Sequence, residues 1–219
     1  MHNVWSDLPQ ASPYVLAMDC ASVNNYNAKA VGRKKINVES IPEPFIGNPE
    51  TATVILLNLN PGDSPDDAKA HGDPEFRAAM ILNLRHELHE SPFYGLNQEF
   101  TWTPCANWWT KNLHELWDKG RLTRARVAER LCVIEWFPYH SSRSGLPKKP
   151  VCPSQEYSFE LARRALGRKL VVGMRAKERW TMVNPRFAEI PYLKNPQCAC
   201  VSVGNMPEGL FDEFVKALR

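Results

Sequence analysis

"TVILLNLNPGDSP", residues 53–65, decides the fold, because a run of branched apolar residues ends abruptly in a polar turn. A short and nearly continuous apolar run is typical of a strand that is buried on both faces of a parallel sheet. Asn60, Pro61 and Gly62 are common turn residues and end this strand. We therefore place the first core strand at residues 53–59.

Further apolar runs predict three more strands, at residues 131–137, 168–173 and 198–203. Helical patterns surround them, with predicted helices at residues 73–90, 106–120, 122–131, 158–167, 174–183 and 209–219. Strands that alternate with helices imply right-handed crossovers and parallel pairing. The predicted fold class is α/β, a three-layer α/β/α sandwich with a four-stranded parallel central sheet.

Length and composition fit a single domain. A chain of 219 residues with 43% hydrophobic content can bury a substantial core, and its length suits one domain better than two. Residues 1–52 are rich in Pro and Asn and predict an irregular lead-in, with room for a short helix. Residues 53–219 form the predicted core, with a helical insertion at about 74–130.

The charge balance excludes a strongly basic nucleic-acid binder, because 24 Asp and Glu residues nearly balance 27 Lys and Arg residues and leave a formal charge of +3. No stretch has a leader pattern or approaches the roughly 20 apolar residues of a membrane span. We therefore expect a cytoplasmic monomer without a membrane partner.

The cysteine and histidine patterns predict neither disulfides nor a bound metal or cofactor. Six cysteines are spread over a chain large enough to fold without cross-links. Cys198 and Cys200 are expected on one face of a strand, as small buried hydrophobes. "RHELHE" spaces its histidines by three, whereas the helical zinc motif needs four.

Ligands of open parallel sheets bind beyond the carboxyl ends of the strands. The backbone amides of Gly62 and Asp63 could there contact an anion or a polar base edge, and the alternative is a simple strand-ending turn. Four stretches are expected to converge at that edge: residues 58–64, 135–144, 173–180 and 204–211.

"LLNLNPG", residues 56–62, resembles the first active-site motif of the uracil-DNA glycosylase superfamily, in its thymine and mismatch-specific branch. "MPEGLF", residues 206–211, is similar to the family's Asn-Pro-Ser-Gly-Leu motif at Pro207, Gly209 and Leu210. The resemblance covers roughly Thr53 to Arg219. It implies a DNA repair hydrolase that flips a base out of DNA and cleaves its N-glycosidic bond.

The resemblance also implies roles for single residues. Asn60 takes the position that orients the attacking water, and Gly62 the position where uracil-restricted members carry a bulky aromatic residue. Asp63 follows at the same turn, and Phe76 is the candidate to stack on the base, with a core position as the alternative.

Two positions depart from the family pattern. Glu135 stands where the family often has a base-reading Asn, so it favours a base with an exocyclic amino group or holds an Arg. Met206 replaces the His or Asn that stabilises the leaving base, and Asn205 is one residue away. His140, in the loop after the second strand, is the other candidate donor, with a solvated side chain as the alternative.

A basic rim that contacts phosphates is predicted around that loop and on the helix before it, at Arg124, Arg143, Lys148 and Lys149. The leading hypothesis is a glycosylase-like protein that binds a flipped or modified base, in DNA or in a nucleoside-like ligand, and hydrolyses its glycosidic bond. The first alternative is a catalytically inactive member of the fold that binds nucleic acid or a nucleotide. The second is an unrelated α/β enzyme that acts on a small molecule.

Overall fold

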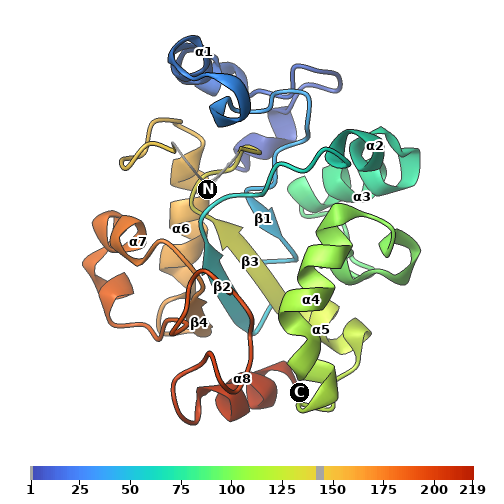
Figure 1. The fold of residues 1–219 in the computed structure, drawn as a ribbon, viewed down its shortest axis with the longest axis vertical. Helices are drawn as coiled ribbons and strands as arrows, with labels where there is room; N and C mark the ends of the chain where they lie inside the picture. The colour runs from blue at the N-terminus through green and yellow to red at the C-terminus, as the bar shows by residue number, and fades with distance from the viewer. Residues whose placement is uncertain (1, 142–145) are drawn as a thin grey trace.

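The computed structural model describes residues 2–141 and 146–219. Within these residues a four-stranded sheet forms in the order β1-β3-β2-β4 (Figure 1). β2 pairs in parallel with β3 and β4, whereas β1 pairs antiparallel with β3. The strands are β1 (Phe45–Ile46), β2 (Val54–Asn58), β3 (Leu131–Glu135) and β4 (Leu170–Gly173). The α/β class is confirmed, but the sheet is mixed and the predicted all-parallel sheet is wrong.

The predicted strand at residues 198–203 is also wrong. Ala199 has a left-handed backbone with φ 54°, which interrupts an extended segment, and the side chain of Asn205 donates to the carbonyl of Cys200 (2.9 Å). A single parallel bridge instead joins Tyr192 to Gly173 at the edge of β4. The chain therefore meets this edge of the sheet earlier than its apolar pattern suggests.

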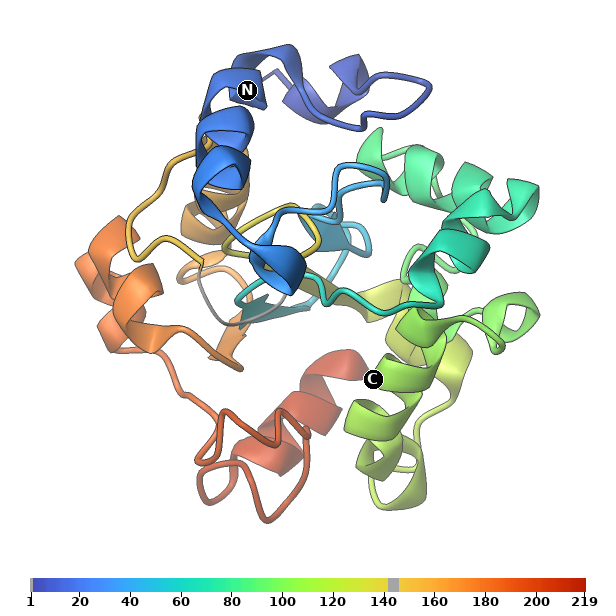
Figure 2. The ribbon, with the colours of Figure 1, turned by 45° about the horizontal axis from the view of Figure 1, so that its top comes forward.

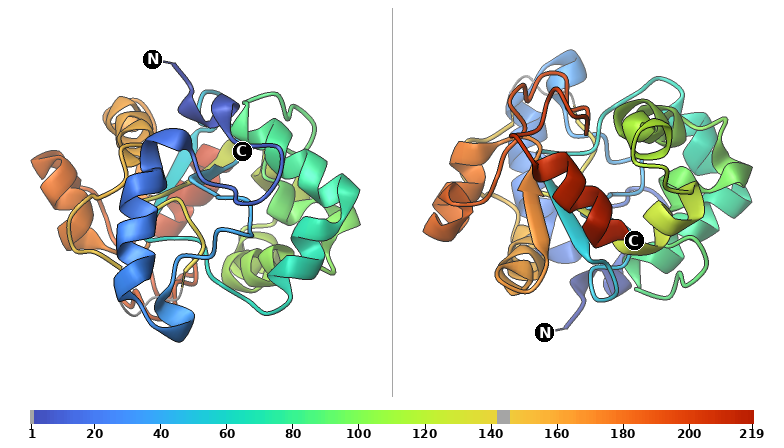
Figure 3. Two further views of the ribbon diagram at one scale, coloured as in Figure 1. Left: turned by 90° about the horizontal axis from the view of Figure 1, so that it is seen from above. Right: turned by 90° about the horizontal axis from the view of Figure 1, so that it is seen from below.

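Helices lie on both sides of the strands. Figure 3 shows α6 and α7, in orange, on one side and the green helices, including α4, on the other. The N-cap side chain of Asp73 accepts from the amides of Glu75 and Phe76 at the start of α3, and the side chain of Thr103 accepts from the amide of Ala106 at the start of α4. The helices are α1 (Cys20–Lys29), α2 (Asp67–Gly72), α3 (Pro74–Leu84), α4 (Pro104–Asp118), α5 (Arg124–Arg130), α6 (Gln155–Ala165), α7 (Lys177–Val183) and α8 (Leu210–Leu218).

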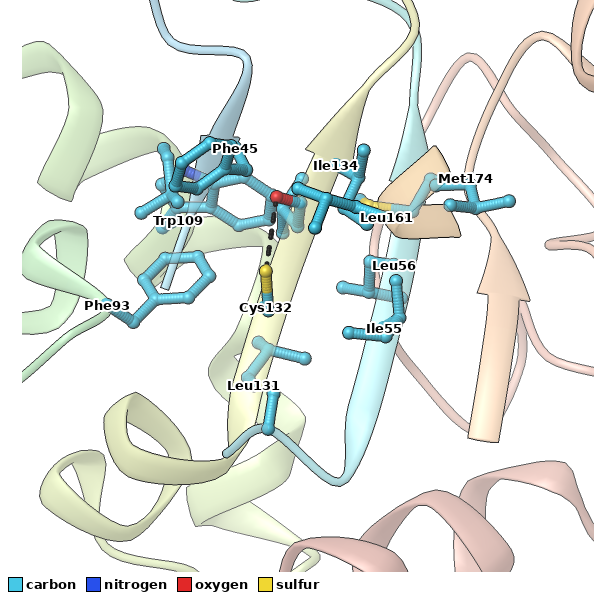
Figure 4. Close-up of a cluster of buried hydrophobic side chains, with 14 of the residues drawn as sticks. Phe45, Ile55, Leu56, Phe93, Trp109, Leu131, Cys132, Ile134, Leu161 and Met174 are labelled. Atoms are coloured by element: carbon cyan, nitrogen blue, oxygen red, sulfur yellow. Dashed lines mark hydrogen bonds between the residues drawn. The ribbon is translucent and has the colours of Figure 1, made fainter. Parts of the chain in front are cut away.

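The core lies around β2 and β3, whose residues are all buried. Figure 4 shows Trp109 of α4 and Phe93 beside Phe45 of β1, with Leu161 of α6 and Met174 near Ile134. The predicted apolar face of α8 is confirmed, since the five residues expected to form it are buried: Leu210, Phe211, Phe214, Val215 and Leu218. None of the helices described is long and apolar enough to cross a membrane.

Residues 2–52 are part of this core. They form α1 and β1 and bury Trp5, Ile41 and Phe45. Figure 2 shows this segment, in blue, together with the gold loop after β3, over one end of the sheet. The segment thus reaches the edge where the parallel strands end.

Candidate functional site

A cavity of about 260 Å³ lies beyond the carboxyl ends of β2 and β3. Parallel strands that end side by side leave such a crevice, as the position of the polar turns predicts. Three of the four expected stretches supply lining residues, and residues 204–211 supply none. The lining consists of Glu43, Ile46, Asn58, Asn60, Pro61, Gly62, Asp63, Ser64, Asp67, Ala70, His71, Phe76, Pro104, Cys105, Trp108, Trp109, Glu135, His140 and Arg175.

The most deeply buried polar pair of the lining joins the last residues of two neighbouring strands. Asn58 and Glu135 are register partners in the parallel ladder, so their side chains lie on the same face of the sheet. Asn58 Nδ2 donates to Glu135 Oε1 over 2.9 Å. The remaining oxygens, Asn58 Oδ1 and Glu135 Oε2, are buried and have no hydrogen-bond partner in the described part of the chain. Each therefore has an unused hydrogen-bonding position, and both residues are part of the cavity lining.

Burial favours the neutral acid form of Glu135. Burial raises its pKa to about 8 against the pull of the Asn58 hydrogen bond, and the nearby Glu43 adds to the increase whereas Arg175 opposes it. A protonated carboxyl donates one hydrogen bond and still accepts. Glu135 and Asn58 together thus offer one donor and one acceptor.

Asn60 is held in one orientation in the turn that follows β2. Its Nδ2 donates to the carbonyls of Pro61 (2.6 Å) and Ser141 (2.8 Å). With the amide nitrogen committed, the side-chain oxygen Oδ1 is the group that Asn60 can offer to a molecule in the cavity.

Gly62 leaves open space at the cavity wall. A Cβ built on it meets nothing within 4 Å, and its backbone is not in the left-handed region. The local fold therefore does not require glycine here, and a larger side chain at this position would reduce the room in or around the cavity. Asp63 is next to it and accepts from Asn37 Nδ2 over 3.0 Å.

His140 and His71 both contact the backbone of the loop around Ile41. Both ring nitrogens of His140 contact carbonyl oxygens, Nδ1 that of Gly62 (2.6 Å) and Nε2 that of Ile41 (3.0 Å). Both ring nitrogens of His140 are thus directed at backbone oxygens. His140 is thus committed to the loops rather than to a leaving base, and it is buried rather than solvated.

His71 is a neutral imidazole. Burial lowers its pKa to about 3, with the neighbouring His140 adding to the decrease, so the ring is neutral. Its Nδ1 accepts from the amide of Ile41 over 3.0 Å, which leaves the ring hydrogen on Nε2. His71 therefore lines the cavity as a neutral N–H donor.

Carboxyl groups flank His140 on both sides. Glu43 Oε2 lies 3.8 Å from Nε2, and Asp67 Oδ2 lies 3.8 Å from Nδ1. Burial raises the pKa of both carboxyls, while the charge on His140 opposes the increase. Tyr94 donates its hydroxyl to Glu43 Oε1 over 2.6 Å, so Glu43 is also fixed.

Aromatic rings form the apolar part of the wall. Phe76 is fully buried and contacts Phe100 edge to face, with ring centroids 5.1 Å apart, so it belongs both to the core and to the cavity. Trp108 is half-buried, and the guanidinium of Arg175 lies 5.7 Å from its ring centroid. A flat ligand can contact such rings with its faces.

The other predicted site residues that the structure describes lie elsewhere. Asn205 donates to the carbonyls of Asn195 and Cys200 and does not line the cavity, and Met206 is buried in the core. Arg124 stacks on Trp117 and begins the helix that enters β3, so it lies at the opposite end of that strand. Lys148 and Lys149 are exposed on the loop, and Arg143 lies outside the described residues.

Several lining residues were missed in the sequence. Arg175 lies in residues 173–180, one of the stretches expected at the edge of the sheet. Its position just after β4 is the only signal in the sequence that points to it. Glu43 lies just before β1, and this strand of two residues gives no periodic signal in the sequence. Asp67, His71 and Trp108 come from helix faces whose direction depends on the tertiary fold.

Comparisons with protein-family models, with curated proteins and with solved structures found no match for this chain. The resemblance to the uracil-DNA glycosylase superfamily therefore depends on the residues of the chain themselves.

Proposed function

We propose that the cavity binds a nucleobase, in DNA or in a nucleoside-like ligand, and that the protein hydrolyses the base's N-glycosidic bond. The observation that carries the proposal is the Asn58–Glu135 pair with its two unpartnered oxygens. Buried polar groups are normally paired, so a ligand with a matching polar edge would complete their hydrogen bonds.

The chemistry of this pair favours one kind of edge. Neutral Glu135 donates through its O–H, and Asn58 Oδ1 accepts. A ring nitrogen beside an exocyclic amino group, as in cytosine or adenine, offers the complementary acceptor and donor. Phe76 and Trp108 supply the apolar surfaces for the flat ring. A base with an exocyclic amino group is therefore the preferred ligand class.

Hydrolysis needs an oriented water and a stabilised leaving group. Asn60 Oδ1 accepts from the water, whose oxygen bonds to the sugar C1′ and whose proton is released to solvent. The C1′–N bond breaks with its electron pair on the base, and the neutral Glu135 donates a proton or a hydrogen bond to that base. Because an amide is a weak base, the sugar must already carry positive character when water attacks.

A base-release assay tests this proposal. The substrates are single- and double-stranded DNA carrying uracil, mispaired thymine, hypoxanthine, cytosine or adenine, together with the free nucleosides. Asn60→Ala removes the water acceptor and is expected to slow release on the order of 100-fold. The matched control is Asn25→Ala on the exposed face of α1, with expected wild-type rates. If no base is released from any substrate, the proposed hydrolysis of the glycosidic bond is wrong.

One observation favours a binding protein as the second candidate. Asn205 and Met206 lie away from the cavity, and both nitrogens of His140 are committed to carbonyls. The donor positions implied by the family resemblance are thus unfilled, and leaving-group stabilisation depends on Glu135. Base binding without release in the same assay would support this candidate.

A further inference from the structure

Two cysteine thiols meet in the loop that follows the Tyr192 bridge. Cys198 Sγ and Cys200 Sγ are 3.1 Å apart. The expectation that both are buried in a strand is wrong, because Cys198 is exposed, Cys200 is half-buried and the segment has no strand. Their proximity therefore has a different cause from strand packing.

The backbone between them creates the contact. Ala199 is fully buried and has a left-handed φ of 54°, which turns the chain between the two cysteines. Asn205 Nδ2 donates to the carbonyl of Cys200, and the amide of Val201 donates to the carbonyl of Asn112 over 2.8 Å. The turn is thus anchored to the rest of the fold on the Cys200 side.

The two thiols differ in their surroundings. The hydrogen bond with Cys200 lowers the pKa of Cys198, and the positive charges of Lys111 and Arg175 act in the same direction. Burial raises the pKa of Cys200 to about 11, and the neighbouring Cys198 adds to the increase. The exposed thiol is therefore the better nucleophile, with a second thiol within reach behind it.

We propose that Cys198 and Cys200 form a reversible dithiol–disulfide site that is oxidised by low-molecular-weight disulfides. Cys198 thiolate attacks one sulfur of the small disulfide, forms a mixed disulfide and releases one thiolate. Cys200 then loses its proton and attacks Cys198 Sγ, which forms the Cys198–Cys200 bond and releases the second thiolate. Two protein thiols are oxidised, and one small disulfide is reduced to two thiols.

The geometry requires only a small movement. A disulfide bond measures about 2.0 Å between its sulfurs, so the pair must approach by roughly 1 Å. The other described cysteines lack this arrangement. Cys132 and Cys152 are buried, Cys105 is half-buried in the cavity wall, and Cys20 is exposed without a neighbouring thiol. Cys20 therefore provides an internal comparison for simple exposure.

Mass spectrometry after equilibration with oxidised and reduced glutathione tests the site. Free thiols are blocked and the protein is digested with trypsin, which releases residues 195–216 with both cysteines and no other. We expect this peptide to lose two hydrogens and to resist the blocking reagent, whereas Cys20 forms only a mixed disulfide. Reduction with excess dithiothreitol should restore both thiols.

Two variants separate the roles of the thiols. Cys200→Ser is expected to accumulate a glutathione adduct on Cys198, because the second attack is removed. Cys198→Ser is expected to show several-fold slower modification of the peptide. The proposal is wrong if the wild-type peptide keeps both thiols while Cys20 reacts, if a lasting glutathione adduct is its only product, or if the cysteines link two chains instead.

Discussion

Glu135 shows how one buried side chain can determine the chemistry of the cavity. It ends β3 beside Asn58, and burial raises its pKa from 4.5 to about 8. A carboxylate at this position would only accept hydrogen bonds, whereas the neutral acid also donates. The hydrogen-bonding character of the Asn58–Glu135 pair therefore depends on burial as much as on residue type.

The same pKa shift predicts a pH dependence of stability. In the unfolded chain Glu135 loses its proton near pH 4.5, and in the folded chain near pH 8. Folding takes up a proton between these values, so the contribution of Glu135 to stability is full below pH 4.5 and is lost as the pH rises to 8. Glu135→Gln cannot ionise and lacks this loss. We expect the free energy of unfolding of the wild type, relative to Glu135→Gln, to fall by a few kcal/mol from pH 5 to pH 8.

Urea unfolding at several pH values measures this difference. Glu178→Gln, which changes an exposed carboxyl on α7, controls for the loss of one charge. A wild-type to Glu135→Gln difference that is constant from pH 5 to pH 8 would show that Glu135 is ionised in the folded protein. The donor assigned to it would then be absent.

At the scale of elements, the edge of β4 depends on one glycine. A Cβ on Gly173 would lie 2.0 Å from the ring of Tyr192, which bridges to this residue in parallel. The Tyr192 hydroxyl also donates to the carbonyl of Phe187 over 3.0 Å, so the ring cannot move freely. Gly173 is thus needed for the close approach of the segment that continues to Cys198 and Cys200.

Gly173→Ala is therefore expected to destabilise the protein by about 1–3 kcal/mol, the range for overpacking a well-packed core. Gly204→Ala is the control, because a Cβ at Gly204 meets nothing within 4 Å. Thermal unfolding compares the two variants with the wild type. Equal stability of both variants would contradict the close packing of Tyr192 on β4.

The elements with strong local signals were predictable from the sequence. β2, β3 and β4 are apolar runs, and α8 has a clear helical period, so the sequence places each of them correctly. β1 has only two residues and leaves no period to detect. The run at 198–203 is apolar because Ala199 and Val201 are buried in an irregular loop, which periodicity alone cannot distinguish from a strand.

At the scale of the whole molecule, the cavity is assembled from segments that are far apart in the sequence. Asn60, Gly62 and Glu135 were predictable because strand ends meet at one edge of a parallel sheet. Glu43 and His71 were not, since they depend on how the N-terminal segment crosses that edge and on the direction of α2. The position of Asn205 was predicted wrongly because the irregular loop before it, residues 198–203, was interpreted as a strand.

The central claim is that the Asn58–Glu135 pair reads the polar edge of a base. The most direct test is calorimetric titration of the wild type, Glu135→Gln and Glu135→Leu with free bases, nucleosides and single-stranded oligonucleotides at pH 7. Glutamine keeps one donor and one acceptor, whereas leucine leaves the ligand edge unpaired, at a cost of about 1–3 kcal/mol. We predict that a base with an exocyclic amino group binds the wild type and Glu135→Gln similarly and Glu135→Leu roughly 10- to 100-fold more weakly, with thermal unfolding showing that all three are folded. Binding of no base to the wild type, or equally tight binding to folded Glu135→Leu, would contradict the claim.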